Sequence, residues 1–303
     1  MKLRNAFVQI ADTANVGLSA GGIRLDLVNA DEINEMTEKA RRIRQHIIKM
    51  TNAAGSGHPG GSLSAVEILT CVYFKIMKHD PKNPGWPERD RFILSKGHAA
   101  PALYAVLAEA GYLPVEELMT LRKLGCRLQG HPSMKTTPGV EMSTGSLGHG
   151  LAVANGMALA AKLDRRLNRI YVLCGDGEMD VGEVWESAML AAHFKLDNVT
   201  MYLDRNMLQL DGPTEKIMSI EPIADKWKAF GWYVQEVDGH NMREIIAATH
   251  RAKETHGKPS VIICHTMKGK GVSFMEGVLN FHGKAPNNEE CAKALEELGA
   301  CRQ

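Results

Sequence analysis

The chain has 303 residues, 44% of them hydrophobic and 23% charged, and its net charge at pH 7 is +1. Such a composition is typical of a globular chain with one large domain or two modest ones. Balanced charge without a long basic run argues against nucleic acid as a partner, and no apolar stretch is long enough for a membrane span.

The six cysteines form no CxxC pair. Cys174 and Cys264 fall inside predicted strands, where a thiol acts as a small apolar side chain. The first thirty residues lack the apolar core of a signal peptide. These features predict a protein of the reducing cytoplasm.

Residues 1–30 show no periodicity and are rich in small side chains, so we predict an N-terminal arm there and one domain over 31–303. From Asp31, apolar residues recur at steps of three and four. This spacing predicts a helix that Asp31 caps and that ends near Gly55. Its basic run, residues 41–44, is interpreted as a solvated face.

The Gly-rich segment 55–62 (GSGHPGGS) precedes a helix predicted over 63–77. It has no GK[ST], so it is not a nucleotide-binding P-loop, and His58 taken alone fits a turn histidine. A short strand over 91–95 leads into the word SKGHA and a helix over 100–110.

The stretch 125–138 is irregular and contains the word GHP at His131. The word GSLGHG, residues 145–150, opens a helix of small residues over 151–163.

The last third of the chain continues the alternation of strands and helices. Lys268 and Lys270, in the word TMKGKG, are interpreted as residues of a flexible surface loop. The pattern predicts helices over 223–230, 242–252 and 288–298 and strands over 233–237 and 260–265.

Residues 170–212 are the most informative stretch. An apolar run over 170–174 ends at Gly175-Asp176-Gly177, an amphipathic segment follows, and a second apolar run over 199–203 precedes Asn206. This order predicts a βαβ unit. The helix is expected to bury Val184, Ala188, Leu190, Ala191 and Phe194.

Asp176 and Asn206 each follow a parallel strand, so they should lie side by side at the carboxyl edge of the sheet. A carboxylate, an amide oxygen and the backbone carbonyl of Leu208 suit a hard ion such as Mg²⁺ or Ca²⁺. Gly177 permits close approach of the backbone, and the following helix offers N–H groups to an anion. We therefore predict a metal-bridged diphosphate; an ordinary strand-to-helix turn is the alternative.

Strands alternate with helices along the whole chain, and neither an internal repeat nor a linker is present. The fold class predicted is α/β, a single domain with a mainly parallel sheet and helices on both faces.

The word GDG, followed about thirty residues later by Asn206, resembles the thiamine-diphosphate signature. The words GDGEMDVGEVWESA and YLDRNMLQLDG are similar to the transketolase family, and specifically to an N-terminal half that is a separate subunit. SGHPGG, SKGHA, GHP, GSLGHG, TMKGKG and FHGKAP extend the resemblance over roughly residues 32–290. Lys96, Ser146, His149 and Phe281 depart from the family's words.

The resemblance assigns roles to the candidate site residues. It implies catalytic histidines that surround the reacting carbon and the sugar hydroxyls: His58, His131 and His282. It implies contacts to thiamine diphosphate from His98, Gly145, Leu147, Gly175, Asp176, Gly177, Asn206 and His282. It implies that Mg²⁺ or Ca²⁺ is bound by Asp176, Asn206 and Leu208.

The implied reaction is transfer of a two-carbon ketol unit from a ketose or ketose phosphate to an aldose or aldose phosphate, as in the pentose phosphate pathway. In this family a glutamate that activates the cofactor, and the arginines that grip substrate phosphate, belong to a second, pyrimidine-binding domain. We find no such domain in this sequence. The resemblance therefore implies a heterotetramer with a separate C-terminal subunit.

Three alternatives stay open. The first is another thiamine-diphosphate enzyme, such as a 2-oxoacid dehydrogenase α subunit or a deoxyxylulose-phosphate synthase, against which SKGHA, GHP and TMKGKG argue. The second is a specialised transketolase for a sulfo-ketose or a branched ketose phosphate. The third is a non-catalytic binding subunit that retains the fold.

One further departure concerns the position before Gly182. Many relatives carry a glutamate there, in a carboxylate network between two active sites, whereas this chain has Val181. Glu186 does match the family. Cofactor binding should survive, because Val181 is not a metal ligand.

Overall fold

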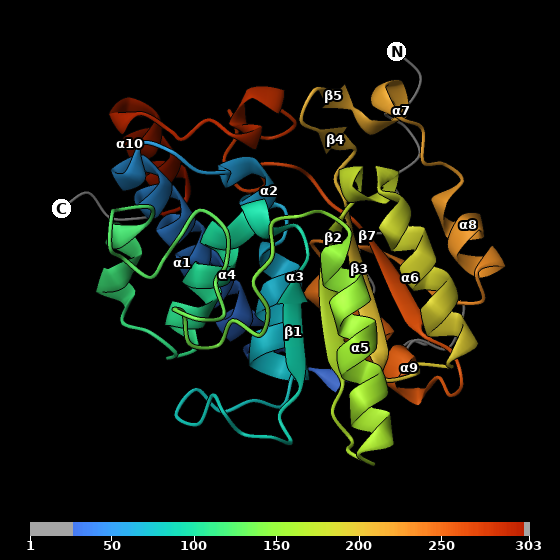
Figure 1. Ribbon diagram of the computed structural model, residues 1–303. Helices are drawn as coiled ribbons and strands as arrows, with labels where there is room; N and C mark the ends of the chain where they lie inside the picture. Colours follow the sequence, from blue (N-terminus) through green and yellow to red (C-terminus); the bar gives the residue numbers. More distant parts are fainter. Residues whose placement is uncertain (1–26, 300–303) are drawn as a thin grey trace.

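A computed structural model describes residues 27–299. Within these residues, five strands form a sheet in the order β1-β2-β3-β7-β6, and every neighbouring pair is parallel. Helices cover both faces of the sheet, as predicted (Figure 1). The strands are Arg91–Leu94 (β1), Ile170–Gly175 (β2), Val199–Arg205 (β3), Tyr233–Asp238 (β6) and Ser260–His265 (β7).

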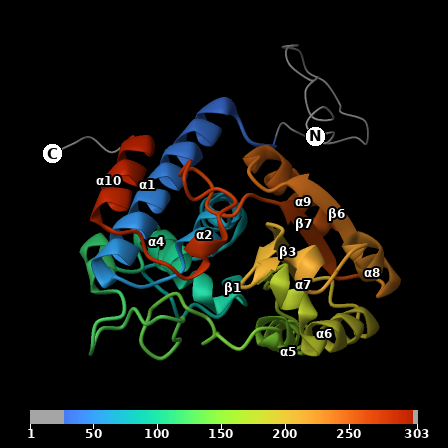
Figure 2. The same cartoon turned by 90° about the horizontal axis from the view of Figure 1, so that it is seen from above.

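The helices form two layers, which Figure 2 shows from above with the sheet between them. One layer consists of α5 (His149–Leu163), α6 (Gly182–His193) and α8 (Ile223–Ala229). The other consists of α1 (Ala30–Ala54), α3 (Val66–Cys71), α4 (Ala100–Glu109) and α9 (Met242–Glu254). Shorter elements and the last helix are α2 (Pro59–Leu63), α7 (Thr214–Ile217) and α10 (Asn288–Glu297).

The two helix layers pack on two separate cores because successive side chains of a strand point to opposite faces. On β3, Met201 and Leu203 belong to the core beneath α5 and α6, whereas Tyr202 belongs to the core beneath α1 and α4. All residues of β2 and β3 are buried. Burial on both faces explains why these strands read as continuous apolar runs.

A small hairpin lies beyond the carboxyl end of β3. Its strands, β4 (Leu208–Gln209) and β5 (Gly212–Pro213), are antiparallel and form a separate two-stranded sheet. In Figure 1 the hairpin lies at the top of the molecule, as does α2. Both elements therefore lie at the edge where parallel strands end.

The beginning of the first long helix differs from the prediction. Asn29 caps α1, because its side chain accepts the N–H of Glu32 while the Glu32 carboxylate accepts the N–H of Asn29. The predicted cap, Asp31, lies inside the helix. Val28 is buried just before the cap. Residues 1–26 of the predicted arm lie outside the described residues.

Three further expectations about helices are wrong. The helix predicted over 63–77 begins at Pro59 and is broken into α2, α3 and a π-helical segment, Val72–Ile76. Leu190 is 42% exposed and Phe194, beyond the end of α6, is 48% exposed. Arg44 is buried in an ion pair with Glu67 instead of facing solvent.

Candidate functional site

Four strands of the sheet each deliver a polar side chain to one pocket, within three residues of the strand's end. These side chains are Lys96 after β1, Asp176 after β2, Asn206 after β3 and Lys268 after β7. The pocket has a volume of about 180 Å³. Convergence of this kind is expected, because parallel strands present their carboxyl ends at one edge.

The lining of this pocket contains most of the residues expected to contact the cofactor or the metal. His98, Leu147, Gly175, Asp176, Gly177, Asn206, Leu208 and His282 all contribute to it. Gly145 does not line it and packs instead beside Gly97 and the ring of His131.

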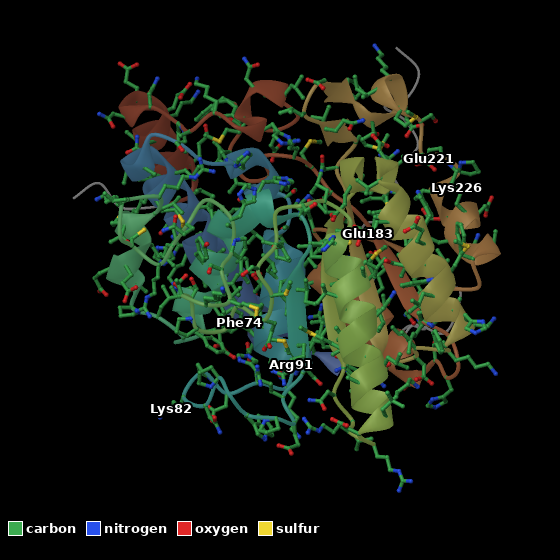
Figure 3. All side chains as sticks on the ribbon, in the orientation of Figure 1. Phe74, Lys82, Arg91, Glu183, Glu221 and Lys226 are labelled. Atoms are coloured by element: carbon green, nitrogen blue, oxygen red, sulfur yellow. The ribbon has the colours of Figure 1, made fainter. Side chains whose placement is uncertain are left out.

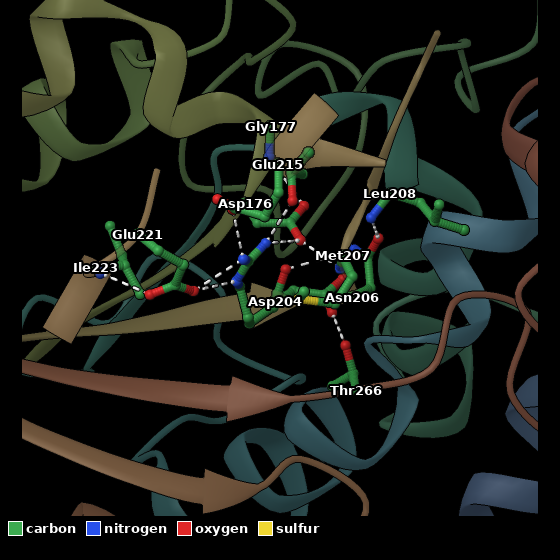
Figure 4. Close-up of polar contacts among 12 residues, drawn as sticks. Asp176, Gly177, Asp204, Asn206, Met207, Leu208, Glu215, Glu221, Ile223 and Thr266 are labelled. Atoms are coloured by element: carbon green, nitrogen blue, oxygen red, sulfur yellow. Dashed lines mark hydrogen bonds and ion pairs between the residues drawn. The ribbon is translucent and has the colours of Figure 1, made fainter. Parts of the chain in front are cut away.

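Asp176 has a strongly polar environment although it is only 2% exposed. Its carboxylate accepts the N–H of Gly177 at 2.9 Å and that of Met207 at 2.6 Å, and Arg205 lies 3.3 Å away (Figure 4). Burial and then the neighbouring Asp204 raise the pKa of Asp176 to about 6, against the opposing charge of Arg205. A further cation would stabilise the charged form of this carboxylate, so Asp176 is suited to be a metal ligand.

Arg205 is a residue that the sequence analysis did not single out. Its buried guanidinium contacts Glu215 and Glu221 at 2.8 Å each, in addition to Asp176 and the hydroxyl of Thr214. The sequence signal that could have identified it is a charged residue close to the end of the apolar run 199–203. Through these contacts, Arg205 connects the segment that follows β3 to Asp176 at the end of β2.

Asn206 directly follows β3, as predicted, and Leu208 begins the hairpin. The Asn206 Oδ1 accepts the N–H of Leu208 at 3.2 Å. The Leu208 carbonyl accepts from the Lys268 ammonium at 3.0 Å, so it already has a cationic partner. Among residues 27–299, no group of three His, Cys, Asp or Glu side chains is arranged to hold a metal.

The expectation that Lys268 lies on a flexible surface loop is wrong, because this side chain is only 2% exposed. Its ammonium also contacts the Nδ1 of His282 at 2.7 Å. Burial and then the charge of Lys96 lower the pKa of Lys268 to about 8. Lys268 thus brings a buried positive charge to the pocket.

Lys96 brings a second buried positive charge. Its ammonium contacts the Asp204 carboxylate and the Gly61 carbonyl. Although burial favours the neutral acid, the ion pair with Lys96 holds the pKa of Asp204 below its usual value. Ser64 and Thr266 donate to the same carboxylate.

Three of the four predicted histidines form a cluster. The ring centres of His58, His98 and His282 lie 5.2–5.7 Å apart. Gly60 permits the close approach of the segment that carries His282, because a Cβ on Gly60 would lie 2.8 Å from the Phe281 carbonyl. His131 lies on a neighbouring loop.

The pKa of each of the four histidines is lowered in this environment. Burial, followed by the charge of Arg122, lowers the pKa of His58 to about 4. Burial, followed by the charge of Lys268, lowers the pKa of His282 to about 3. Burial also lowers the pKa of His98 and of His131. The rings are therefore neutral near pH 7 and can both accept and donate a hydrogen bond.

Two further observations test whether a diphosphate group fits the pocket. The Nε2 of Gln209 is buried and has no hydrogen-bond partner among the described residues, although it belongs to a pocket-lining residue. A Cβ on Gly177 would lie 2.8 Å from the Gln209 side chain, so only glycine leaves this space free. An orphan donor, a glycine cradle and two buried ammonium groups suit an anion. The residues present thus fit a diphosphate group.

Glu178 is a second residue that sequence reasoning missed. It is buried and accepts the N–H of Gly148 at 2.7 Å and that of Gly175 at 3.0 Å, as well as the hydroxyl of Ser95. These contacts tie the loop before α5 to the end of β2. The word GDGE contained the signal, but burial of its glutamate was not apparent from the sequence.

Two of the departures from the family's words, His149 and Val181, lie outside the pocket, whereas Lys96 lines it. His149 pairs with Glu183 at 2.9 Å on the surface, where the start of α5 meets α6; Figure 3 labels Glu183. Val181 packs against Gly148, where a Cβ would lie 2.8 Å from its side chain. Neither residue lines the pocket.

Comparisons with known proteins agree with this geometry. Residues 35–302 match the family described as "Transketolase, thiamine diphosphate binding domain". The chain is 49% identical to a 6-deoxy-6-sulfo-D-fructose transketolase subunit of Clostridium sp. (strain MSTE9), over 87% of this chain and 96% of that protein. It is 47% identical to an apulose-4-phosphate transketolase subunit of Actinobacillus succinogenes, over 88% of this chain and 96% of that one.

The fold resembles that of a solved transketolase. The crystal structure of the Campylobacter jejuni enzyme superposes with a TM-score of 0.84 at 37% identity. The match covers 88% of this chain but 43% of that one. The chain therefore spans about two fifths of the length of this transketolase, whereas it spans nearly all of the two subunit relatives.

Proposed function

Because the chain belongs to the transketolase family, as its thiamine-diphosphate-binding part, we propose that it works as the N-terminal subunit of a two-subunit transketolase. The complete enzyme would transfer a two-carbon ketol unit from a ketose to an aldose. The observation that carries the proposal is the meeting of Asp176, Asn206, two buried lysines and three histidines at one sheet edge.

Thiamine diphosphate, when bound, supplies the electron sink for breaking and forming the carbon–carbon bond. Asp176, Asn206 and the Leu208 carbonyl would hold Mg²⁺ or Ca²⁺. Lys268, Gln209 and the backbone at Gly177 would bind the diphosphate. Gly145 and Leu147 lie at or near the pocket and would contact the remainder of the cofactor.

The histidines would orient the sugar and carry protons. The Lys268 ammonium can only donate, so it leaves the His282 Nδ1 as acceptor and places the ring proton on Nε2. Neutral His58 and His131 can hydrogen-bond sugar hydroxyls or take a proton from them. His98 lines the same pocket as Lys96 and would contact both substrate and diphosphate.

A separate subunit would complete the active site. Support comes from the lengths of the relatives: the chain covers nearly all of two proteins named as subunits. Large apolar side chains are also exposed on the segment that follows the metal-binding residues: Met207, Leu210, Ile217 and Met218. Exposed apolar groups near a pocket are typical of interaction surfaces. We infer a pyrimidine-binding partner and a heterotetramer.

The substrate is proposed from the relatives. Those two subunits are named for transketolases of 6-deoxy-6-sulfo-D-fructose and of apulose-4-phosphate. We infer that this chain serves a sugar that carries a phosphate or a sulfonate, in the cytoplasm. The described cysteines are free thiols, and none of the helices between residues 27 and 299 is long and apolar enough to cross a bilayer.

Ligand binding to the assembled subunits tests the proposal. Thiamine diphosphate should raise the melting temperature only when Mg²⁺ is present, because a ligand that binds the native state stabilises it. Asp176→Ala should abolish this shift. Asp180→Ala is the matched control, because Asp180 is exposed on the same segment and does not line the pocket. A full shift in the Asp176→Ala protein would contradict the proposed site.

A further inference from the structure

Arg122 lies beside His58, one ring of the histidine cluster. It follows a 3₁₀ helix, Val115–Thr120, and its backbone has a φ of 59°, in the left-handed region that side chains other than glycine rarely adopt. Its side chain is exposed. A strained backbone at the rim of a candidate site is a reason to ask what the side chain does.

Three segments hold the guanidinium in place. Its NH1 donates to the Ser56 hydroxyl at 2.6 Å, and its NH2 lies 3.5 Å from the Nδ1 of His58. Gly130 packs against it so closely that a Cβ there would lie 3.0–3.1 Å from its atoms. Arg122 is thus ordered although it is solvent-accessible.

No carboxylate neutralises this charge within residues 27–299, where Ser56 and His58 are its polar contacts. Other ordered arginines of the chain differ: Arg44 pairs with Glu67, and Arg205 with three carboxylates. The charge of Arg122 acts electrostatically on the site. Burial is the largest cause of the lowered pKa of His58 and of His131, and the charge of Arg122 is the second.

We propose that Arg122 and Ser56 form an oxyanion subsite that binds the terminal phosphate or sulfonate of the sugar substrate. The inference rests on the proposed function and deepens it. A planar guanidinium beside a hydroxyl matches the oxygens of either anion. The subsite adjoins His58, whose ring would contact the sugar, so it would receive the charged group of that sugar.

The expected location of substrate recognition changes accordingly. The resemblance to transketolases places the anion-binding arginines in the partner subunit. Here the diphosphate-binding chain also contributes a cation at the mouth of its histidine cluster. Discrimination between charged and uncharged sugars would then depend on both subunits.

Substrate discrimination in the assembled two-subunit enzyme tests the subsite. The kcat/KM is measured for three ketoses of equal length that end in a hydroxyl, a phosphate or a sulfonate. In Arg122→Gln the ratio of the preferred anionic ketose to the neutral ketose should fall about tenfold to a hundredfold, as loss of a charge-assisted hydrogen bond predicts. The phosphate and sulfonate arms identify which anion the subsite serves.

Two further variants sharpen this experiment. Lys123→Gln removes the same charge from the adjacent exposed residue and should leave the ratio unchanged. Arg122→Lys keeps the charge without the planar fork and should recover part of the ratio. If Arg122→Gln lowers turnover of the neutral and anionic ketoses equally, Arg122 acts only through His58 and the subsite is refuted.

Binding to the chain without turnover separates this inference from the proposed function. Inorganic phosphate and inorganic sulfate are titrated while the side-chain nitrogens of Arg122 and His58 are followed by NMR. Saturable shifts that Arg122→Gln abolishes support the subsite even if no ketol transfer is found. Absence of shifts in the wild-type chain overturns it even if ketol transfer is found.

Discussion

Buried charges around the pocket would each cost folding free energy if they were alone, and the chain offsets this cost by pairing them. Lys96 pairs with Asp204, and Arg205 with Asp176. Removing one partner of such a pair leaves an uncompensated buried charge. Lys268 lies against a carbonyl and a ring nitrogen instead of a carboxylate, which leaves its positive charge available to an anionic ligand.

The half-buried histidines make stability sensitive to acid. His58 and His282 have pKa values of about 4 and about 3, below the ordinary 6.5. The unfolded chain binds protons on these rings as the pH falls below 6.5, whereas the folded chain does not. Their contribution is therefore complete above pH 6.5 and is lost as the pH falls towards 4.

Urea unfolding of the chain between pH 7 and pH 4.5 measures this contribution. The free energy of unfolding of the wild type should fall more steeply than that of a His58→Gln/His282→Gln variant. The difference in slope should reach at most about 1.4 kcal/mol per pH unit for each histidine. His193→Gln, at an exposed position on α6, should keep the wild-type slope. Equal slopes in all three proteins would contradict the assigned burial.

The residues that follow strands were predictable from the sequence, and buried lysines were not. Asp176 and Asn206 could be placed together because strand ends meet at one edge. Lys268 gave no such signal, since a lysine in a Gly-rich word is normally solvated. Its burial results from segments around Gly60, Leu208 and His282 that are distant in sequence.

At the level of elements, short loops on a rigid sheet position the site. Gly269 donates its N–H to the Gly60 carbonyl, which ties the segment after β7 to α2. Behind this segment, His240 accepts the N–H of Met267 and contacts Glu67. The loop that carries Lys268 is therefore held from both sides.

The capping box of α1 provides a test at this level. Asn29→Ala should lower the free energy of unfolding by about 1 kcal/mol, because it removes the acceptor for the N–H of Glu32. Asp31→Ala should change it by less than about 0.5 kcal/mol, as expected for an exposed residue outside the cap. Urea unfolding measures both. A larger effect at Asp31 than at Asn29 would contradict the observed cap.

The alternation of strands and helices was predictable because buried parallel strands and amphipathic helices have different periods. Breaks within elements were not. The helix predicted over 63–77 is broken at Ser64 and Ala65, between α2 and α3. Leu190 and Phe194 were misplaced because Phe194 lies beyond the last turn of α6 and Leu190 points away from the buried stripe.

At the scale of the whole molecule, the chain has the thiamine-diphosphate-binding domain of the transketolase family on about two fifths of the length of a solved transketolase. The fold class and the family could be inferred from the sequence, since motifs of the diphosphate site lie within this chain. The identity of the proposed partner could not, because its residues would be on another polypeptide. We therefore infer that this chain supplies half of an active site.

Ketol transfer by separated and combined subunits tests this central claim most directly. Turnover is measured with thiamine diphosphate, Mg²⁺, a ketose phosphate donor and an aldose acceptor. We predict no turnover above background by this chain alone or by a pyrimidine-binding transketolase subunit of the same organism alone, and full turnover when the two are mixed. Robust turnover by this chain alone, or none by the mixture, would contradict the claim.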